Sequence, residues 1–394
     1  MEKLRFMVAV WLCCLVCAPF APLQAQPIEP WSVVSIAMSN DGRYLAVKHE
    51  ARVWIDSSSY FDSGVWIYDL RNLLSPPLFL GESDKSYTTM LFSPNGEYMA
   101  VGDFYRLNVF EVNSGNVILD LSHSVTPIRS DFRRIAFSPD SSYLMSFSYS
   151  YTEDEVSIWD IEAGQRVQTI AAQLNMADIG QLWLSPDWRQ FINWGYPSQI
   201  DTVHDFDIER GVGQERGNIA TGVRHAGAAF SADSSFFGLA TWDGKVQAYE
   251  TESWALINER EFHQTPCGEG GVSLAFAHSH PWLAIECGWE GLLTVWDFKS
   301  NEVIFRDERY PFGNPQFTLN DAYLIANLNE NSPAKYALAV WDIEEGFELT
   351  LYPGNSPRVH PNNELMAVIG HDSRIWIWHI PQNKLLVILP APHR

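Results

Sequence analysis

The chain has 394 residues, of which 46% are hydrophobic, 13% aromatic and 19% charged. This composition supports a large apolar core and excludes wholesale disorder. The formal net charge of −22 repels phosphate backbones and anionic lipid, and no run of Lys and Arg forms a basic patch, so we expect no nucleic-acid partner.

The first 25 residues have the features of a secretory signal. Lys3 and Arg5 give a positive start, and Phe6 to Phe20 form an apolar run that is too short to span a bilayer. Leu23-Gln24-Ala25 is similar to a small-residue cleavage site. We therefore expect a signal peptide over 1–25, a mature domain over 26–394, and export to the periplasm or the extracellular space. Retention as an uncleaved anchor is the alternative, and no later segment is long and apolar enough to span a membrane.

One sequence unit recurs eight times between about residue 32 and residue 390. Its first half is an apolar strand that ends in Phe-Ser-Pro-Asp or a variant of it, followed by a turn and a second apolar strand. Pro-Asp and Asn-Gly pairs favour a tight turn at this point. The Ser position of the unit is occupied by Ser39, Ser93, Ser138, Ser185, Ser231, Ala277, Thr318 and His360, which are 41 to 54 residues apart.

The second half of the unit is a strand rich in β-branched and aromatic residues that ends in Trp-Asp or a related pair. These pairs are Tyr68-Asp69, Phe110-Glu111, Trp159-Asp160, Phe206-Asp207, Tyr249-Glu250, Trp296-Asp297, Trp341-Asp342 and Trp378-His379. The two halves step together at about the length of a four-stranded blade, and no helical period runs through the mature chain. The sequence predicts an all-β fold, a β-propeller of four-stranded antiparallel blades. We expect eight blades, with seven as the alternative if a weak unit is displaced.

The units resemble WD40 repeats over nearly the whole mature chain. Trp159-Asp160, Trp296-Asp297 and Trp341-Asp342 match the signature dipeptide of that family, and Asp243-Gly244-Lys245-Val246 matches the turn before its third strand. The Gly-His pair of the family is missing from every unit, so its usual side-chain hydrogen-bond network is expected to be incomplete. Exported TolB-like bacterial propellers are the second resemblance. Since Leu385 to Leu389 supply the last strand of the eighth unit, we expect the ring to close between whole blades.

Aromatic residues gather in the segments between the second and third strands of the first four units. The resemblance implies that these segments lie on the ligand-binding face. The first is expected to be a long loop from His49 to Gly64. The candidate binding residues are Trp54, Tyr60, Phe61, Phe104, Tyr105, Tyr149, Tyr151, Trp194 and Tyr196. Aromatic rings with neighbouring carboxylates suit a basic peptide, a sugar or a partner protein, and plugging of the inner core is the alternative.

Cys267 and Cys287 are the two cysteines of the mature chain. In an oxidising compartment they favour one disulfide, and two buried thiols are the alternative. Strict antiparallel pairing in the sixth unit places residue 272 opposite Cys287. A Cys267–Cys287 disulfide therefore requires the glycine-rich segment 268–271 to curl back.

Catalytic and metal-binding motifs are absent from the sequence. It contains no Gly-x-Ser-x-Gly, His-Glu-x-x-His or phosphate-cradling loop, so we assign no catalytic residue, cofactor or metal ligand. His278-Ser279-His280 has no carboxylate nearby in the sequence, which favours a solvated turn over a metal site. We expect a noncatalytic module that binds a protein or peptide; a hydrolase or lyase that uses the central funnel and a sugar-binding module are the alternatives. The oligomeric state does not follow from the sequence.

Overall fold

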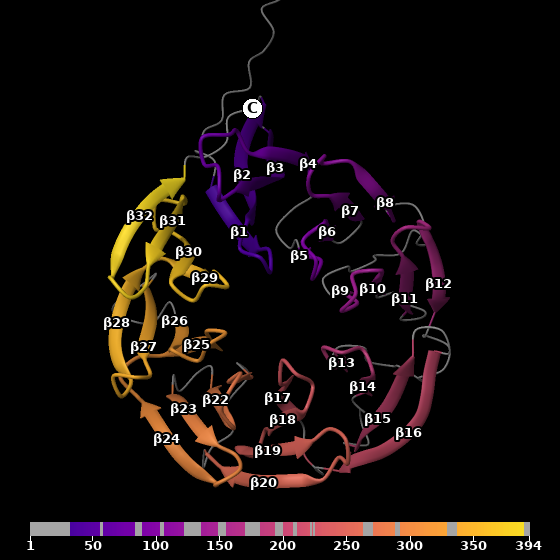
Figure 1. Cartoon of the computed structure of the whole chain (residues 1–394), viewed down its shortest axis with the longest axis vertical. Helices are drawn as coiled ribbons and strands as arrows, with labels where there is room; N and C mark the ends of the chain where they lie inside the picture. The colour runs from indigo at the N-terminus through magenta and orange to yellow at the C-terminus, as the bar shows by residue number, and fades with distance from the viewer. Residues whose placement is uncertain are drawn as a thin grey trace, which may run out of the picture.

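The strands form a ring of eight separate sheets around a central opening (Figure 1). The computed structural model describes residues 32–55, 58–82, 89–102, 106–121, 135–148, 155–169, 182–193, 200–207, 211–220, 223, 225–262, 271–287, 292–328 and 337–389. All regular structure in these residues is β-strand, and each sheet has four antiparallel strands. The eight-bladed propeller is confirmed, and the seven-bladed alternative is excluded.

Each blade takes four consecutive strands of the chain. Blade 1 has β1 (Ser32–Met38), β2 (Tyr44–Ile55), β3 (Ser58–Asp69) and β4 (Leu78–Glu82); blade 2 has β5 (Thr89–Phe92), β6 (Tyr98–Gly102), β7 (Leu107–Glu111) and β8 (Val117–Asp120). Blade 3 has β9 (Ile135–Phe137), β10 (Tyr143–Ser148), β11 (Glu155–Asp160) and β12 (Gln165–Thr169); blade 4 has β13 (Leu182–Leu184), β14 (Gln190–Asn193), β15 (Ile200–Asp207) and β16 (Gly211–Ala220). Blade 5 has β17 (His225–Phe230), β18 (Phe236–Thr241), β19 (Lys245–Glu250) and β20 (Leu256–Glu261); blade 6 has β21 (Val272–Phe276), β22 (Trp282–Cys287), β23 (Leu292–Asp297) and β24 (Glu302–Asp307). Blade 7 has β25 (Phe312–Phe317), β26 (Tyr323–Leu328), β27 (Ala337–Asp342) and β28 (Glu348–Pro353); blade 8 has β29 (Asn355–Val359), β30 (Leu365–Ile369), β31 (Ile375–His379) and β32 (Lys384–Leu389).

The ring closes between blade 8 and blade 1 without exchange of a strand. The first strand of each blade lies nearest the central opening and the fourth lies at the outside (Figure 1). At the closing boundary, the backbone N–H of Val33 donates a hydrogen bond to the carbonyl of Ser373 over 3.2 Å. Val33 also shares an apolar cluster with Ile369 and Leu389 of blade 8. The expected closure between whole blades is therefore confirmed.

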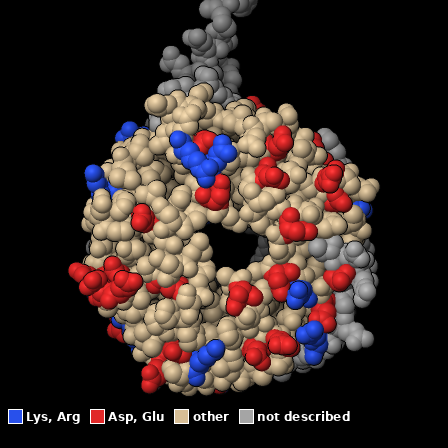
Figure 2. Space-filling model, viewed as in Figure 1, with Lys and Arg blue, Asp and Glu red and all other residues tan. Residues whose placement is uncertain are grey.

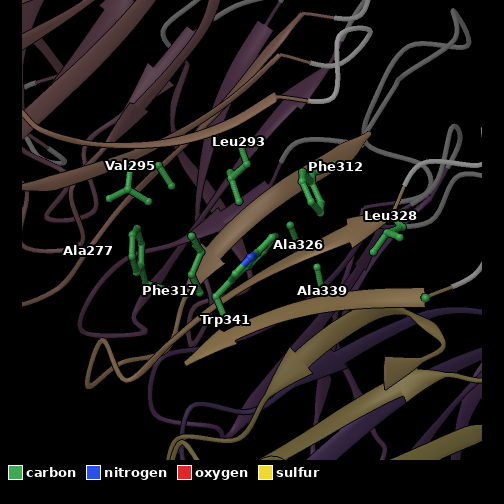
Figure 3. Close-up of a cluster of buried hydrophobic side chains, with 12 residues drawn as sticks. Ala277, Leu293, Val295, Phe312, Phe317, Ala326, Leu328, Ala339 and Trp341 are labelled. Atoms are coloured by element: carbon green, nitrogen blue, oxygen red, sulfur yellow. The ribbon is translucent and has the colours of Figure 1, made fainter. Parts of the chain in front are cut away.

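Apolar side chains fill the space between each pair of neighbouring blades. Eight buried clusters occur in the described residues, one at each boundary of the ring. Figure 3 shows the cluster between blades 6 and 7, where Leu293 and Val295 face Phe312 and Trp341. The alternating pattern of the sequence explains this arrangement, because successive side chains of a strand point to opposite faces of its sheet and each face meets a neighbouring blade.

A hydrogen-bonded turn accounts for the repeated Ser and Asp between the first and second strands. In blade 1 the Ser39 hydroxyl donates to Asp41 over 2.6 Å and accepts the backbone N–H of Tyr44 over 2.9 Å. The Asp41 carboxylate accepts the backbone N–H of Arg43 over 3.0 Å. The same donor and acceptor positions are filled by Ser93 and Asn95, Ser138 and Asp140, Ser185 and Asp187, Ser231 and Asp233, and Thr318 and Asn320.

These turns also connect neighbouring blades. The residue after the Asp or Asn adopts a positive φ, which turns its side chain toward the preceding blade. Ser234 (φ 62°) accepts the backbone N–H of Asp187 over 3.0 Å in this way. Asp321 (φ 55°) accepts the N–H groups of both His278 and Ser279, over 2.8 and 2.6 Å. The turns of all blades share one rim, which we call the turn rim; the opposite rim carries the connections between second and third strands and is called the loop rim.

Candidate functional site

The segment from His49 to Gly64 is a β-hairpin, which corrects the expectation of a long loop. Its strands β2 and β3 have 12 residues each, whereas β6, β7, β10 and β11 in the next two blades have five or six. Flanking pairs in the sheet end at Glu50 on the β1 side and at Gly64 on the β4 side. Beyond this point, pairs from Ala51 with Asp62 to Ile55 with Ser58 form a two-stranded extension, which we call the arm.

Three of the predicted aromatic positions fall on the arm. The backbone of Trp54 pairs with Ser59, that of Val53 with Tyr60, and that of Arg52 with Phe61. The other six positions, Phe104, Tyr105, Tyr149, Tyr151, Trp194 and Tyr196, lie outside the described residues. A shared binding face for the nine residues therefore stays a prediction.

The base of the arm is anchored by buried polar residues. The Lys48 ammonium lies 2.8 Å from the Glu50 carboxylate, and the Lys48 side chain is only 1% exposed. His49 packs against the edge of the Trp66 ring with their centroids 5.4 Å apart. Burial lowers the pKa of His49 to about 4, so this imidazole is neutral at neutral pH.

A polar cleft of about 640 Å³ lies on the turn rim between blades 4 and 5. It is bounded by the turns that follow β13, β17 and β19 and by the outer part of blade 4. The lining residues are Asp187, Arg189, Gln190, Asp205, Arg216, Asp233, Ser234, Ser235, Phe236, Glu250, Thr251 and Glu252. Its volume lies in the range of ordinary ligand pockets, but its lining is mainly polar, whereas most small-molecule pockets are mainly apolar.

The lining of the cleft is acidic. Five carboxylates and two guanidinium groups give it a formal charge of −3. Arg216 forms an ion pair with Asp205, and Arg189 lies 3.9 Å from Asp187. Burial would raise the pKa of Asp233, but hydrogen bonds from Ser231 and Ser235 outweigh it and hold that pKa below its usual range. Figure 2 shows that Asp and Glu side chains outnumber Lys and Arg on the face it presents.

Gln190 lines the cleft and connects its two blades. Its side chain is 9% exposed, and its Nε2 donates to the carbonyl of Thr251 over 3.1 Å. Its Oε1 is buried and has no hydrogen-bond partner. The Thr251 hydroxyl in turn donates to the carbonyl of Ser234, so three lining residues from two blades are connected. A buried acceptor without a donor is costly, so the contact of Gln190 with Thr251 is only partly compensated.

The buried titratable groups near the loop rim are distributed over different blades. Burial lowers the pKa of His225 in blade 5 to about 4. Burial also raises the pKa of Glu286 in blade 6 to about 7, although hydrogen bonds from Ser273 and the backbone of Asn314 act to lower it. His49 lies in blade 1. The described residues contain no group of three or more His, Cys, Asp or Glu side chains placed to hold a metal ion.

Asp321 supplies a carboxylate at His278-Ser279-His280 that the sequence did not indicate. It comes from blade 7, and one of its oxygens lies 3.3 Å from Nδ1 of His280. The His280 ring stacks on Trp282 with a centroid distance of 4.2 Å. The contacts of Asp321 with two backbone N–H groups show that it holds this turn in place.

Cys287 is disulfide-bonded and fully buried at the end of β22. Val272 lies opposite Cys287 in the register of blade 6, as the pairing argument predicted. Cys267 lies outside the described residues, so the Cys267–Cys287 pairing stays a prediction.

Comparison with solved structures agrees with the architecture. The chain matches the β-propeller domain of Cps50 (Swd1) from Myceliophteria thermophila with a TM-score of 0.53 and 16% identity, over 75% of this chain and 98% of that one. It matches the C-terminal WD40 domain of Sif2 with a TM-score of 0.58 and 13% identity, over 87% and 95% of the two chains. It also matches a chain of the mitotic checkpoint complex with a TM-score of 0.50 and 13% identity, over 90% and 94%.

The chain has the fold of a WD40 β-propeller. No family model matches its sequence, and no curated protein matches it. Three tryptophans at the Trp-Asp positions of this propeller have different partners: Trp159 donates to Ser146, Trp296 to Asn301 and Trp341 to Asp307. Among the described residues, these three tryptophans therefore do not share one hydrogen-bond pattern.

The sequence did not predict the cleft, although it indicated the position of two of its lining residues. Asp187 and Asp233 occupy the repeated turn, which places both on one rim. Gln190 and Glu252 carry no such signal, because their proximity depends on how blades 4 and 5 pack.

Proposed function

We propose that this protein is a noncatalytic interaction module that acts outside the cytoplasm and binds a protein partner through its loop rim. The arm is the observation that carries the proposal. It extends five residue pairs beyond the flanking strands, about 17 Å, and among the described residues neither β1 nor β4 continues along its edges. Open strand edges and aromatic side chains are both common means of binding a polypeptide.

The solved structures support this proposal through their fold and context. One is a chain within a mitotic checkpoint complex. In the described residues an apolar cluster lies between every pair of neighbouring blades, so the closed ring is a rigid support for the connections of the loop rim. Binding residues often lie on loops held by a rigid scaffold.

A pull-down with the mature chain, residues 26–394, from secreted and envelope fractions tests the proposal. We expect a protein partner that is lost when Tyr60, Phe61, Tyr149 and Tyr151 are replaced by alanine. The control is Leu73→Ala/Leu74→Ala, which removes two exposed apolar side chains from the turn rim of blade 1. A folded quadruple variant that retains the partner contradicts the assigned face.

Failure of the wild-type chain to capture any protein contradicts the proposed function. It would favour the sugar-binding or enzymatic alternatives, and the central opening would be tested next. Export is tested separately by N-terminal sequencing of the protein from both fractions, with Gln26 as the expected first residue.

A further inference from the structure

The innermost strands of the blades line the central opening, which Figure 2 shows as a gap at the centre of the molecular surface. Among the described residues of these eight strands, Arg358 of β29 is the only one whose side chain is charged at neutral pH. From this residue and its surroundings, we infer that the opening contains a binding site for a carboxylate group, which Arg358 holds. The site does not depend on the proposed function, because no residue of the arm takes part in it.

The fold does not require an arginine at position 358. Arg358 lies opposite Ala367 in the register of blade 8, two residues before the turn. The residues at the same register in six of the other seven blades are apolar: Ala37, Leu91, Ala136, Trp183, Ala229 and Ala275. Packing of the innermost strands therefore favours an apolar side chain at this register. A charge that breaks such a pattern in one repeat alone is expected at a functional site.

The guanidinium group of Arg358 has no carboxylate partner among the described residues. The side chain is exposed to solvent, and its Nη1 donates to the carbonyl of Pro357 over 2.9 Å. Burial nevertheless lowers the pKa of Arg358, and no neighbouring carboxylate opposes this shift. A side chain of an innermost strand is exposed and desolvated at once when it faces a narrow opening that protein surrounds. Because a cation in such surroundings is normally paired, the carboxylate of a ligand fits here.

The innermost strand of blade 7 adds neutral amide groups beside this charge. Gln316 of β25 has the same register as Arg358, and Asn314 lies two residues earlier in that strand. Gln316 is partly exposed and Asn314 is exposed. One guanidinium with neutral amides matches a single negative charge. A carboxylate also fits the planar fork of an arginine, whereas a phosphate dianion would keep an excess of negative charge.

An NMR titration of the full mature chain tests the inference, with the signals of a small ligand as the readout. The probe is N-acetylglycine, and its neutral counterpart is N-acetylglycinamide. We expect saturable binding of the probe with a dissociation constant of about 1 mM or tighter, and at least about tenfold weaker binding of the neutral counterpart.

Arg358→Leu connects this binding to the opening, because leucine is the residue that blade 2 has at the same register. The variant should bind N-acetylglycine at least about tenfold more weakly, since the charge-assisted hydrogen bonds are lost. Its midpoint in urea denaturation should not fall, because an apolar residue suits this register. A lower midpoint with unchanged binding would assign Arg358 a structural role only. If the leucine variant does not fold, Arg358→Gln, which reproduces the residue of blade 7, is measured in its place.

The matched control is Lys384→Leu. It removes the same positive charge from an exposed position of the outermost strand β32 in the same blade. Affinity for N-acetylglycine should stay unchanged, because Lys384 is on the outer wall of the ring and not in the opening.

A longer ligand distinguishes the source of the carboxylate. Tighter binding of acetyl-Ala-Ala-Gly than of N-acetylglycine indicates the C terminus of a polypeptide, and equal or weaker binding indicates a small organic acid. Absence of saturation by both ligands up to about 10 mM overturns the inference, as does equal affinity in the wild-type chain and Arg358→Leu. Neither result depends on whether the pull-down captures a partner.

Discussion

Asp321 shows how one side chain holds two blades together. It belongs to blade 7, its side chain is 0% exposed, and it accepts two backbone N–H groups of blade 6. Asp321→Ala leaves both donors without this acceptor, so the free energy of unfolding should fall by about 2–4 kcal/mol in urea denaturation.

Asn363→Ala is the matched control for this prediction. Asn363 occupies the same turn position with a similar φ, 61° against 55° for Asp321, so the backbone strain of alanine is common to both variants. Its bond to the N–H of Asn320 is longer, 3.4 Å. We expect a loss of about 1 kcal/mol; equal losses in the two variants would show that the Asp321 bonds contribute nothing specific.

Glu286 predicts a pH dependence of stability. Burial raises its pKa to about 7 in the folded state, whereas an unfolded glutamate titrates near 4.5. As pH rises from 4.5 to 7, the unfolded chain ionises first, so this group lowers the free energy of unfolding, by about 3 kcal/mol in total. His49 and His225, with pKa values of about 4, act in the opposite sense and remove stability as pH falls below 6.5.

Glu286→Gln isolates the contribution of this carboxyl group. Between pH 4.5 and 7, stability should rise more steeply with pH in the variant than in the wild-type chain, because the opposing contribution of Glu286 is removed while that of His49 and His225 is kept. Glu302→Gln, at an exposed position of β24 in the same blade, should leave the wild-type slope unchanged. Identical slopes for all three proteins would contradict a raised pKa at Glu286.

At the scale of elements, the arm should be the least protected part of blade 1. Among the described strands, the two strands of the arm pair only with each other, whereas Leu45 to Val47 of the same β2 lie between two partners. Two-stranded hairpins are marginal in isolation. Hydrogen-exchange mass spectrometry should show faster exchange in residues 51–55 and 58–62 than in 45–48. Equal protection would mean that something else covers the edges of the arm.

The strands were predictable because alternation and turn residues are local signals. The arm was not predictable, because the polar run from Asp56 to Ser59 is typical of a loop. In the structure, the strand pairing that includes Lys48 with Val65 continues through Val53 and Ile55. The cleft required information from packing. Gln190 meets Thr251 only when blades 4 and 5 are side by side, and their distance in the sequence gives no sign of this contact.

At the scale of the molecule, Gly42 lies at the boundary where the ring closes. It has a φ of +69°, and a Cβ atom at this position would lie 2.1 Å from Nε2 of His360 in blade 8. Gly42→Ala should therefore combine backbone strain with a steric conflict at the boundary and cost about 2–4 kcal/mol in urea denaturation.

Gly96→Ala separates these two contributions. Gly96 occupies the same turn position in blade 2 with a φ of +73°, and the nearest atom to its Cβ would be 4.0 Å away. This variant should show the backbone strain alone, about 1 kcal/mol. Adding His360→Ala to Gly42→Ala should recover the difference in a double-mutant cycle. A coupling energy of zero would mean that the histidine moves aside without cost.

The boundary between blades 8 and 1 is built from the same kind of contacts as the other seven. Val33 and Leu389, near the two ends of the ring, lie in one apolar cluster. A short peptide that joins these ends, with a new break in a linker between two other blades, would give a circular permutant in which every sheet remains uninterrupted. The architecture thus does not depend on the blade at which the chain starts. In-frame duplication or loss of one unit would change the circumference of the ring, while each remaining blade would keep its own hydrogen bonds.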